Sequence, residues 1–363
     1  MNVRETGMKK VGVLVFAVGG LLVFIGCGGT GDNGLNSGYT SGDANGFSRQ
    51  TPDGQTGGQM GTVTTTGGAL MADRVYFQSG SVISSAKPDG TDVKKYIGLT
   101  NGIGALAVDP TGKIYAFAGG TAGIDKTTYD VYLGSSVDEK DAKQLTQTGF
   151  QGIGAIEFSP DGKTVFFTAQ SKDGKSRLYS LGTDGKDLKT IDVADDFDLD
   201  STGTKLLYTR YDDTVGQIFW RKVSGGDATQ LTNDPYDHFQ PRWSPDGSQI
   251  AFSAKVQGNY HVFVMDAKGE HSKQVTVDTD NEFSPAFSPD GTELAFVRHA
   301  TDGTRAGVFR IKVGGTDQKS IVLQQNLAPM VSWSVGVPDK DGKKTLAAAY
   351  FGGSLARGRF TAS

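Results

Sequence analysis

Apolar and polar positions alternate along most of the chain after residue 72, and no stretch there has a helical period. Segments such as 164–168 and 260–265 carry this alternation, and glycine-containing turns bound them. Alternation over four to eight residues between turn signals is typical of half-buried strands. The pattern therefore predicts an all-β chain built from short antiparallel strands.

A four-residue polar motif divides these strands into repeats. Ser-Pro-Asp-Gly occurs at 159–162, 244–247 and 288–291. Proline sets φ, aspartate bonds the local backbone and glycine accepts positive φ, so the phrase predicts a tight turn between two strands. Degenerate copies of the turn occur elsewhere in the chain. The apolar residue directly before each full or degenerate turn, called the anchor, recurs at spacings of 50, 41, 44, 44 and 46 residues: Val108, Phe158, Leu199, Trp243, Phe287 and Trp333.

Each repeat continues beyond this first turn. A third strand follows, then a second glycine turn (183–186, 266–269, 313–316) and a short fourth strand. Four antiparallel strands in about 45 residues are typical of a β-propeller blade, whereas immunoglobulin-like units need about 100 residues. The aromatic anchors could form a carbohydrate platform, but their fixed place before each turn favours packing between neighbouring blades.

These features resemble the TolB-like propeller, the WD-like repeat of bacterial exported proteins. The resemblance rests on the three Ser-Pro-Asp-Gly turns, on the glycine turn after each third strand, and on 234–247, and it covers about 72–363. Residues 73–97 match strands two to four of a blade, and 327–363 could supply the missing first strand and more. We favour a ring of six blades closed by pairing both ends, which removes exposed sheet edges. Seven blades result if 345–361 builds a blade of its own.

The N-terminus has the pattern of an export signal. Basic residues in 1–10 precede a 16-residue apolar run, which is too short to span a bilayer comfortably and ends before Cys27. The sequence Val-Phe-Ile-Gly-Cys at 23–27 resembles the bacterial lipobox, so we expect 1–26 to be removed and Cys27, the single cysteine, to be lipidated. The alternative is a plain signal or anchor. Attachment through Cys27 implies that the protein is exported and held on a bacterial membrane, facing the periplasm or the exterior.

Residues 27–71 predict a flexible tether. The segment 28–71 holds 13 glycines in 44 residues and few apolar side chains, so it cannot bury enough surface to offset its ordering entropy. The whole chain has a net charge of −4 and no broad cationic face. Nucleic acid is therefore not an expected partner.

Candidate binding residues lie at one mouth of the predicted channel. The loops that enter the first strands surround this mouth, and their polar residues occupy matching places in three successive blades: Asp195, Asp196, Asp237, His238, Arg242, Asn281 and Glu282. Arg242 stands one residue before its anchor, as Glu157 and Asp198 do in the two preceding blades. Aspartates also cap turns in ordinary loops, so a purely structural role for this set stays open.

No motif for catalysis or metal binding emerges. Residues 196–201 alternate acids as a calcium loop does, but the sixth position is not glycine and the twelfth is Leu207. The chain has no Gly-x-Ser-x-Gly, no His-Glu-x-x-His and no Cys/His cluster. We expect no metal and no cofactor, and we also expect no fused hydrolase domain such as some propellers of this family carry.

The resemblance implies a binding function. TolB-like rings serve in envelope assemblies, where the funnel holds a peptide segment of another lipoprotein. We therefore expect a lipid-anchored, monomeric ring that binds an envelope protein or peptide without catalysis. Two alternatives stay open: a polysaccharide-acting, lyase-like propeller with its site at the channel mouth, for which His238 and Arg242 are the only hint, and a scaffold or sensor subunit.

Overall fold

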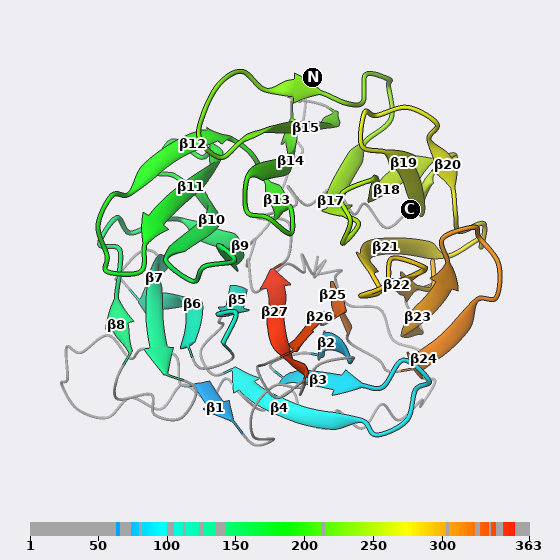
Figure 1. The fold of residues 1–363 in the computed structure, drawn as a ribbon, viewed down its shortest axis with the longest axis horizontal. Helices are drawn as coiled ribbons and strands as arrows, with labels where there is room; N and C mark the ends of the chain where they lie inside the picture. Colours follow the sequence, from blue (N-terminus) through cyan, green and yellow to red (C-terminus); the bar gives the residue numbers. More distant parts are fainter. Residues whose placement is uncertain are drawn as a thin grey trace, which may run out of the picture. The chain divides into compact units, whose positions relative to one another are not determined.

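The described residues form six antiparallel sheets arranged as the blades of a ring (Figure 1). A computed structural model describes residues 63–65, 74–79, 82–99, 105–111, 114–122, 127–135, 142–211, 215–302, 305–323, 327–333, 335–338 and 344–352. None of these residues is helical, so the described part of the chain has no apolar helix that could cross a membrane. The predicted all-β propeller with six blades is confirmed. Residues 1–26 and Cys27 lie outside the described residues.

Blades 1 and 2 use strands from both ends of the described chain. Blade 1 contains β25 (Leu327–Trp333), β2 (Val75–Ser79), β3 (Val82–Ala86), β4 (Lys94–Leu99) and β1 (Val63–Thr65). Blade 2 contains β26 (Val335–Pro338), β27 (Lys344–Gly352), β5 (Ala105–Val108), β6 (Ile114–Ala122), β7 (Thr127–Ser135) and β8 (Lys143–Gln144).

The other four blades are continuous four-stranded meanders whose first strand is innermost. Blade 3 contains β9 (Gly152–Phe158), β10 (Thr164–Gln170), β11 (Ser176–Gly182) and β12 (Lys189–Val193). Blade 4 contains β13 (Asp196–Leu199), β14 (Lys205–Tyr211), β15 (Gly216–Lys222) and β16 (Thr229–Gln230). Blade 5 contains β17 (His238–Trp243), β18 (Gln249–Val256), β19 (Asn259–Asp266) and β20 (Lys273–Gln274). Blade 6 contains β21 (Asn281–Phe287), β22 (Glu293–His299), β23 (Ala306–Lys312) and β24 (Lys319–Leu323).

The ring closes as the sequence predicts. β25 pairs antiparallel with β2, with Trp333 opposite Val75 and Val331 opposite Phe77, so a late strand completes the earliest blade. No seventh blade forms from the described residues, because β27 joins the sheet of β5 instead. Another difference concerns the expected tether: its residues 63–65 form β1, which pairs with β4 at the outer edge of blade 1.

The Ser-Pro-Asp-Gly turns share one hydrogen-bond pattern. In all three, the serine hydroxyl donates to the aspartate carboxylate at 2.6 Å, and the carboxylate accepts the amide two residues later at 3.0–3.1 Å. The serine oxygen accepts the amide that opens the second strand at 2.9–3.0 Å. In two degenerate turns, Asp109 and Asp200 accept that amide at 2.7 and 2.6 Å. The repeated Ser-Pro-Asp-Gly motif therefore forms a local turn and not a binding or catalytic site.

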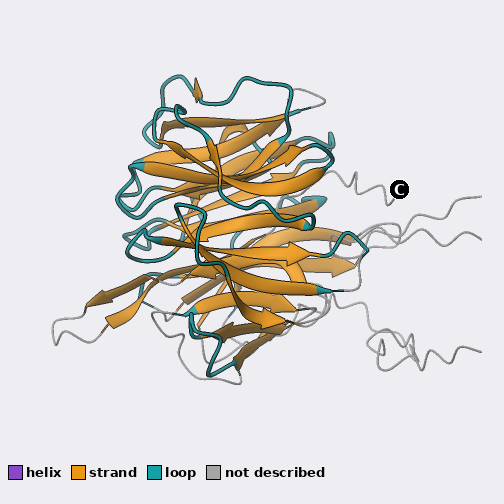
Figure 2. Cartoon of the chain, turned by 90° about the vertical axis from the view of Figure 1, so that its right-hand side faces the viewer, coloured by secondary structure: helices purple, strands orange, loops and turns teal. Residues whose placement is uncertain are grey.

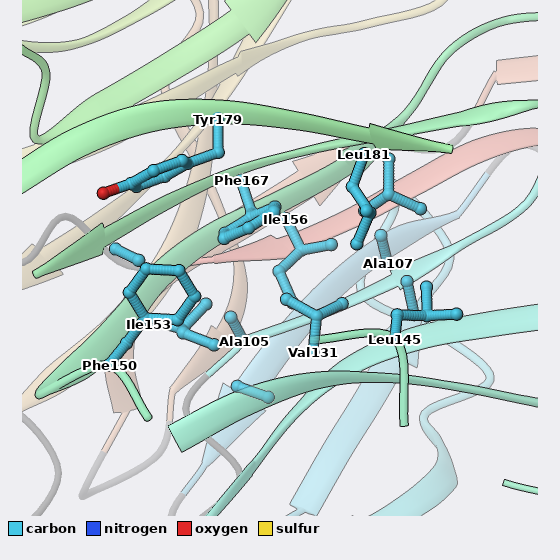
Figure 3. Packing of buried hydrophobic residues seen from close by; sticks show 14 of the residues in the cluster. Ala105, Ala107, Val131, Leu145, Phe150, Ile153, Ile156, Phe167, Tyr179 and Leu181 are labelled. Carbon is cyan, nitrogen blue, oxygen red and sulfur yellow. The ribbon is translucent and has the colours of Figure 1, made fainter. Parts of the chain in front are cut away.

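The hydrophobic core is divided into clusters that lie between neighbouring blades. Figure 3 shows the cluster between blades 2 and 3, which contains Val131 of blade 2, Phe167 of blade 3, and Leu145 and Phe150 from the segment that connects the two blades. The anchors Phe158, Leu199, Trp243, Phe287 and Trp333 are each at most 7% exposed and join clusters shared with the preceding blade. Their predicted packing role is confirmed, since buried rings offer no carbohydrate platform.

Candidate functional site

The seven candidate residues lie at or next to the innermost strands of blades 4, 5 and 6. These strands are β13, β17 and β21, and they stand side by side around the centre of the ring (Figure 1). The structure therefore brings the loops that enter them to one face, as the repeat predicts. The seven side chains differ in their hydrogen-bond and ion-pair partners.

Asp237 and Asn281 join consecutive blades. Asp237 Oδ1 accepts the amide of Gly216 at 2.9 Å, and Asn281 Oδ1 accepts the amide of Tyr260 at 3.1 Å. Both amides lie at or next to the start of the third strand of the preceding blade. The matching sequence positions thus reflect one repeated structural bond, which supplies an acceptor for an amide at a sheet end.

Glu282 lies in a buried ion-pair network. Its side chain is fully buried, and its Oε1 accepts bonds from Arg298 at 3.1 Å (Nε) and 2.5 Å (Nη2). Its Oε2 lies 3.2 Å from His261 Nδ1, and Arg298 also pairs with Asp278 at 2.8 Å. Because a buried charge is costly unless it is paired, the network compensates the Glu282 carboxylate at the contact between blades 5 and 6.

His238 is buried rather than open to a ligand. Its Nε2 lies 3.1 Å from Asp234 Oδ1, and its ring stacks on Phe252 with centroids 5.3 Å apart. Burial lowers the pKa of His238, against the charges of Asp234 and Asp237, which favour protonation. Its Nδ1 has no hydrogen-bond partner within the described part of the chain.

Arg242 bridges blades 5 and 4. Its Nη1 lies 3.3 Å from Asp196 Oδ2 and 3.2 Å from the carbonyl of Phe197, and it donates to the carbonyl of Pro241 at 2.8 Å. Asp196 is fully buried and also accepts its neighbour's amide, while Asp195 is 5% exposed. Phe197 and Leu199 are buried, and residues 196–201 form strand β13 and the start of the turn that follows it.

Two further carboxylates complete the channel wall. Glu157 Oε2 accepts the amide of Leu199 at 3.2 Å, and Asp198 Oδ2 accepts the amide of Trp243 at 2.7 Å. Each carboxylate thus reaches from one innermost strand to the anchor of the next blade. A side chain that joins two innermost strands lies on the wall of the central channel. In the sequence, Glu157 and Asp198 are distinguished only by their common position, one residue before the anchor.

The wall carboxylates have unusual protonation. Burial raises the pKa of Asp198 to about 7, against the charge of Arg242. Burial and the charge of Asp198 raise the pKa of Glu157 well above its usual range. A raised carboxyl pKa favours the protonated, neutral form, so burial makes these two side chains possible hydrogen-bond donors.

A second acidic group lies on the outside of blade 5. Asp266, Glu270 and His271 bring one donor atom each within 4.8 Å of the others, and this is the only such group among the described residues. Asp266 already accepts the amides of Lys268 and Glu270 at 2.9 Å, as an ordinary turn aspartate does. The group is therefore explained by the turn.

The family comparison agrees with the architecture. Residues 198–346 match the family described as TolB beta propeller domain. Two curated proteins are related at a distance: the uncharacterized peptidase YuxL of Bacillus subtilis is 27% identical over 149 residues, and the lasso peptide isopeptidase AtxE2 of Asticcacaulis excentricus is 29% identical over 120. These matches cover 40% and 32% of this chain but only 21% and 14% of those proteins.

Solved structures share the fold. TolB from Acinetobacter baumannii superposes with a TM-score of 0.59 at 22% identity, over 72% of this chain and 66% of that one. A "putative TolB" from Agrobacterium tumefaciens gives a TM-score of 0.58 at 18% identity, over 78% of this chain and 99% of that one. Together with the family match, these structures confirm the resemblance to TolB-like propellers.

Proposed function

We propose that this TolB-like β-propeller is a binding module of the cell envelope, which holds a segment of another envelope protein and performs no catalysis of its own. Lipidated Cys27 anchors the exported chain to a membrane, and the glycine-rich residues that follow keep the ring away from the lipid surface. The ring acts as a monomer that faces the periplasm or the cell exterior.

The channel wall carries this proposal. Glu157, Asp198 and Arg242 present two carboxylates and one guanidinium on three consecutive innermost strands. All three are held by bonds to the backbone of a neighbouring blade, so their positions are set before a ligand arrives. Preorganised polar groups lower the cost of binding, and these acidic side chains suit the polar backbone and the donor side chains of a peptide segment.

The same bonds argue against catalysis by the seven candidate residues. A general acid or base must reach a substrate proton, and a nucleophile needs an adjacent base. Asp237, Asn281 and Glu282 instead bond to the preceding blade or to their own network, and His238 is buried against Phe252. We therefore propose that they stabilise the mouth whose surface the partner contacts.

A crosslinking pull-down from the organism's own envelope tests the binding function. We expect the double variant Glu157→Gln/Asp198→Asn to recover at least tenfold less of the crosslinked partner than the unmodified protein. Asp161→Asn is the matched control, since it alters a carboxylate in an exposed turn. Equal recovery by the double variant would refute a role for the channel wall, and turnover of a polysaccharide panel by the purified protein would refute the non-enzymatic assignment.

Membrane fractionation tests the anchor independently. Cys27→Ala removes the thiol that a lipid would modify, so we expect the variant to lose acyl labelling and to leave the membrane fraction. Cys27→Ser serves as a second variant with a side chain closer in size. A Cys27→Ala protein that stays with the membranes would contradict lipidation while leaving the binding proposal intact.

A further inference from the structure

The hairpin β26–β27 adds to blade 2 on the side that faces the ring centre. β27 pairs antiparallel with β5, the first strand of that blade, with Ala349 opposite Val108 and Gly352 opposite Ala105. In the other five blades the first strand ends its sheet, and no described strand pairs with its inner edge. Blade 2 is therefore the one described blade whose inner edge is extended.

β27 lies inside the ring. Besides β5, it contacts β9 and β25, the first strands of the two neighbouring blades, and also β2. In Figure 1 the red arrow of β27 stands in the central space between the innermost strands, and Figure 2 shows the same stack of blades from the side. The strand consequently fills part of the channel that the proposed function assigns to a partner.

The inner edge of a first strand carries an amide that needs an acceptor. In blades 4 and 5, that amide belongs to the anchors Leu199 and Trp243, and the carboxylates of Glu157 and Asp198 accept it. The corresponding anchor of blade 2 is Val108, which is 1% exposed and lies opposite Ala349 of β27. Backbone pairing by β27 thus takes the place that a carboxylate fills in the two other blades.

The pairing is short. Among the described residues, four pairs join β27 to β5 and three join β5 to β6, whereas nine join β6 to β7. An edge held by so few pairs, inside a channel otherwise lined by completed blades, is suited to exchange with another extended segment.

We infer that the inner edge of β5 is a strand-addition site, held by β27 in the isolated protein, and that an extended peptide segment binds there by replacing β27 antiparallel to β5. This inference rests on the proposed function and specifies how the channel receives its partner. Recognition is mainly by the backbone, so the segment is free of proline over four residues. In this register its four residues lie opposite Ala105, Leu106, Ala107 and Val108.

The register indicates which backbone groups matter. The amide of Asp109 donates to the carbonyl of Ile114 on β6 at 2.8 Å. Because backbone groups alternate sides along a strand, Val108 and Leu106 direct theirs toward β27, opposite Ala349 and Phe351. Ala107 and Tyr350 then form the closer, non-hydrogen-bonded pair, which is suitable for a cross-strand disulfide.

The test uses the full chain with Cys27→Ser, so that engineered cysteines are the only thiols. The probe is a fluorescent synthetic peptide of residues 343–352, KKTLAAAYFG. We expect the double variant Ala349→Pro/Phe351→Pro, in which β27 cannot pair, to bind this peptide at least tenfold more tightly than the parent. A scrambled peptide and one N-methylated at the residues matching Ala349 and Phe351 should not bind, whereas N-methylation at the residue matching Tyr350 should be tolerated.

A disulfide that ties β27 to β5 gives a second test, which does not depend on whether the proline variant folds. In Ala107→Cys/Tyr350→Cys, we expect oxidation to abolish peptide binding and reduction to restore the level of the parent protein. Equal binding by the oxidised and reduced forms would overturn the inference, as would equal binding of both N-methylated peptides. If the peptide exchanges as described but no form crosslinks to an envelope protein, the proposed function fails and the strand-addition site stands. If an envelope protein is captured equally by the locked form and no peptide exchanges, only the strand-addition inference fails.

Discussion

Neutralising Asp198 should change how the stability of the ring depends on pH. Its folded-state pKa of about 7 lies above the ordinary value of 3.8, because burial disfavours the charged carboxylate. A raised acid pKa means that its contribution to stability is complete below pH 3.8 and is lost as the pH rises through 7. Because of Asp198, the free energy of unfolding should therefore decrease as the pH rises from 5 to 8.

The magnitude follows from the difference of about three pKa units. At 1.36 kcal/mol per unit, the total is about 4 kcal/mol, of which about 2–3 kcal/mol falls between pH 5 and pH 8. Asp198→Asn keeps an oxygen that can accept the amide of Trp243 but does not ionise. It also removes the charge that helps to raise the pKa of Glu157. The variant should therefore gain about 2–3 kcal/mol over the parent protein on going from pH 5 to pH 8.

Urea unfolding followed by tryptophan fluorescence at pH 5, 6, 7 and 8 measures this difference. His238 has a lowered pKa and gives the opposite slope, but it is present in both proteins and cancels in the comparison. The control is Asp246→Asn: its turn bonds hold the pKa of Asp246 at about 2, so this variant should run parallel to the parent above pH 5. Parallel curves for Asp198→Asn and the parent would refute the assigned pKa and its cause.

Three further changes test the packing of the ring, each by urea or thermal unfolding. Gly269→Ala should reduce the free energy of unfolding by about 2–4 kcal/mol, because Gly269 has φ +85° and an added Cβ would lie 2.6 Å from the carbonyl oxygen of Leu231. The control Gly247→Ala, with φ +70° and no atom within 4 Å of the added Cβ, should cost only about 1 kcal/mol, and equal losses for the two variants would contradict the role of the Leu231 contact. Trp243→Ala should cost about 3–5 kcal/mol, because the ring is 7% exposed between blades 4 and 5, and a loss below 1 kcal/mol would show that it does not wedge them. Deleting the chain from residue 327 removes β25 and with it Val331 and Trp333 from the core shared with blade 6, so cooperative unfolding should disappear; a cooperative transition like the parent's would refute closure by β25.

The blades were readable from the sequence because their determinants are local. Each Ser-Pro-Asp-Gly turn forms its bonds within five residues, and alternation sets which side chains face a neighbouring sheet. The anchor spacing therefore predicted the blade, its repetition and the burial of Trp243 and Phe287. Closure by β25 was also predictable, since an incomplete N-terminal blade lacks a first strand.

The roles of the polar residues depended on contacts between blades. Asp237 and Asn281 were correctly placed in the entering loops, but their bonds to Gly216 and Tyr260 span about twenty residues of sequence and join separate sheets. Glu157 and Asp198 bond to anchors more than forty residues away. No local pattern distinguishes such an acceptor from a free carboxylate, because the difference lies in the position of the next blade.

The sequence alone determined a ring of four-stranded blades, since turn chemistry and strand period act over a few residues and repeat. Only the tertiary structure decided that residues 344–352 add to the inner edge of β5 instead of starting another blade. Pairing of that kind depends on which strand edge remains open when the ring closes, and this is a property of the whole assembly of blades. The same reason explains why the chemistry of the channel became visible only after the blades were in place.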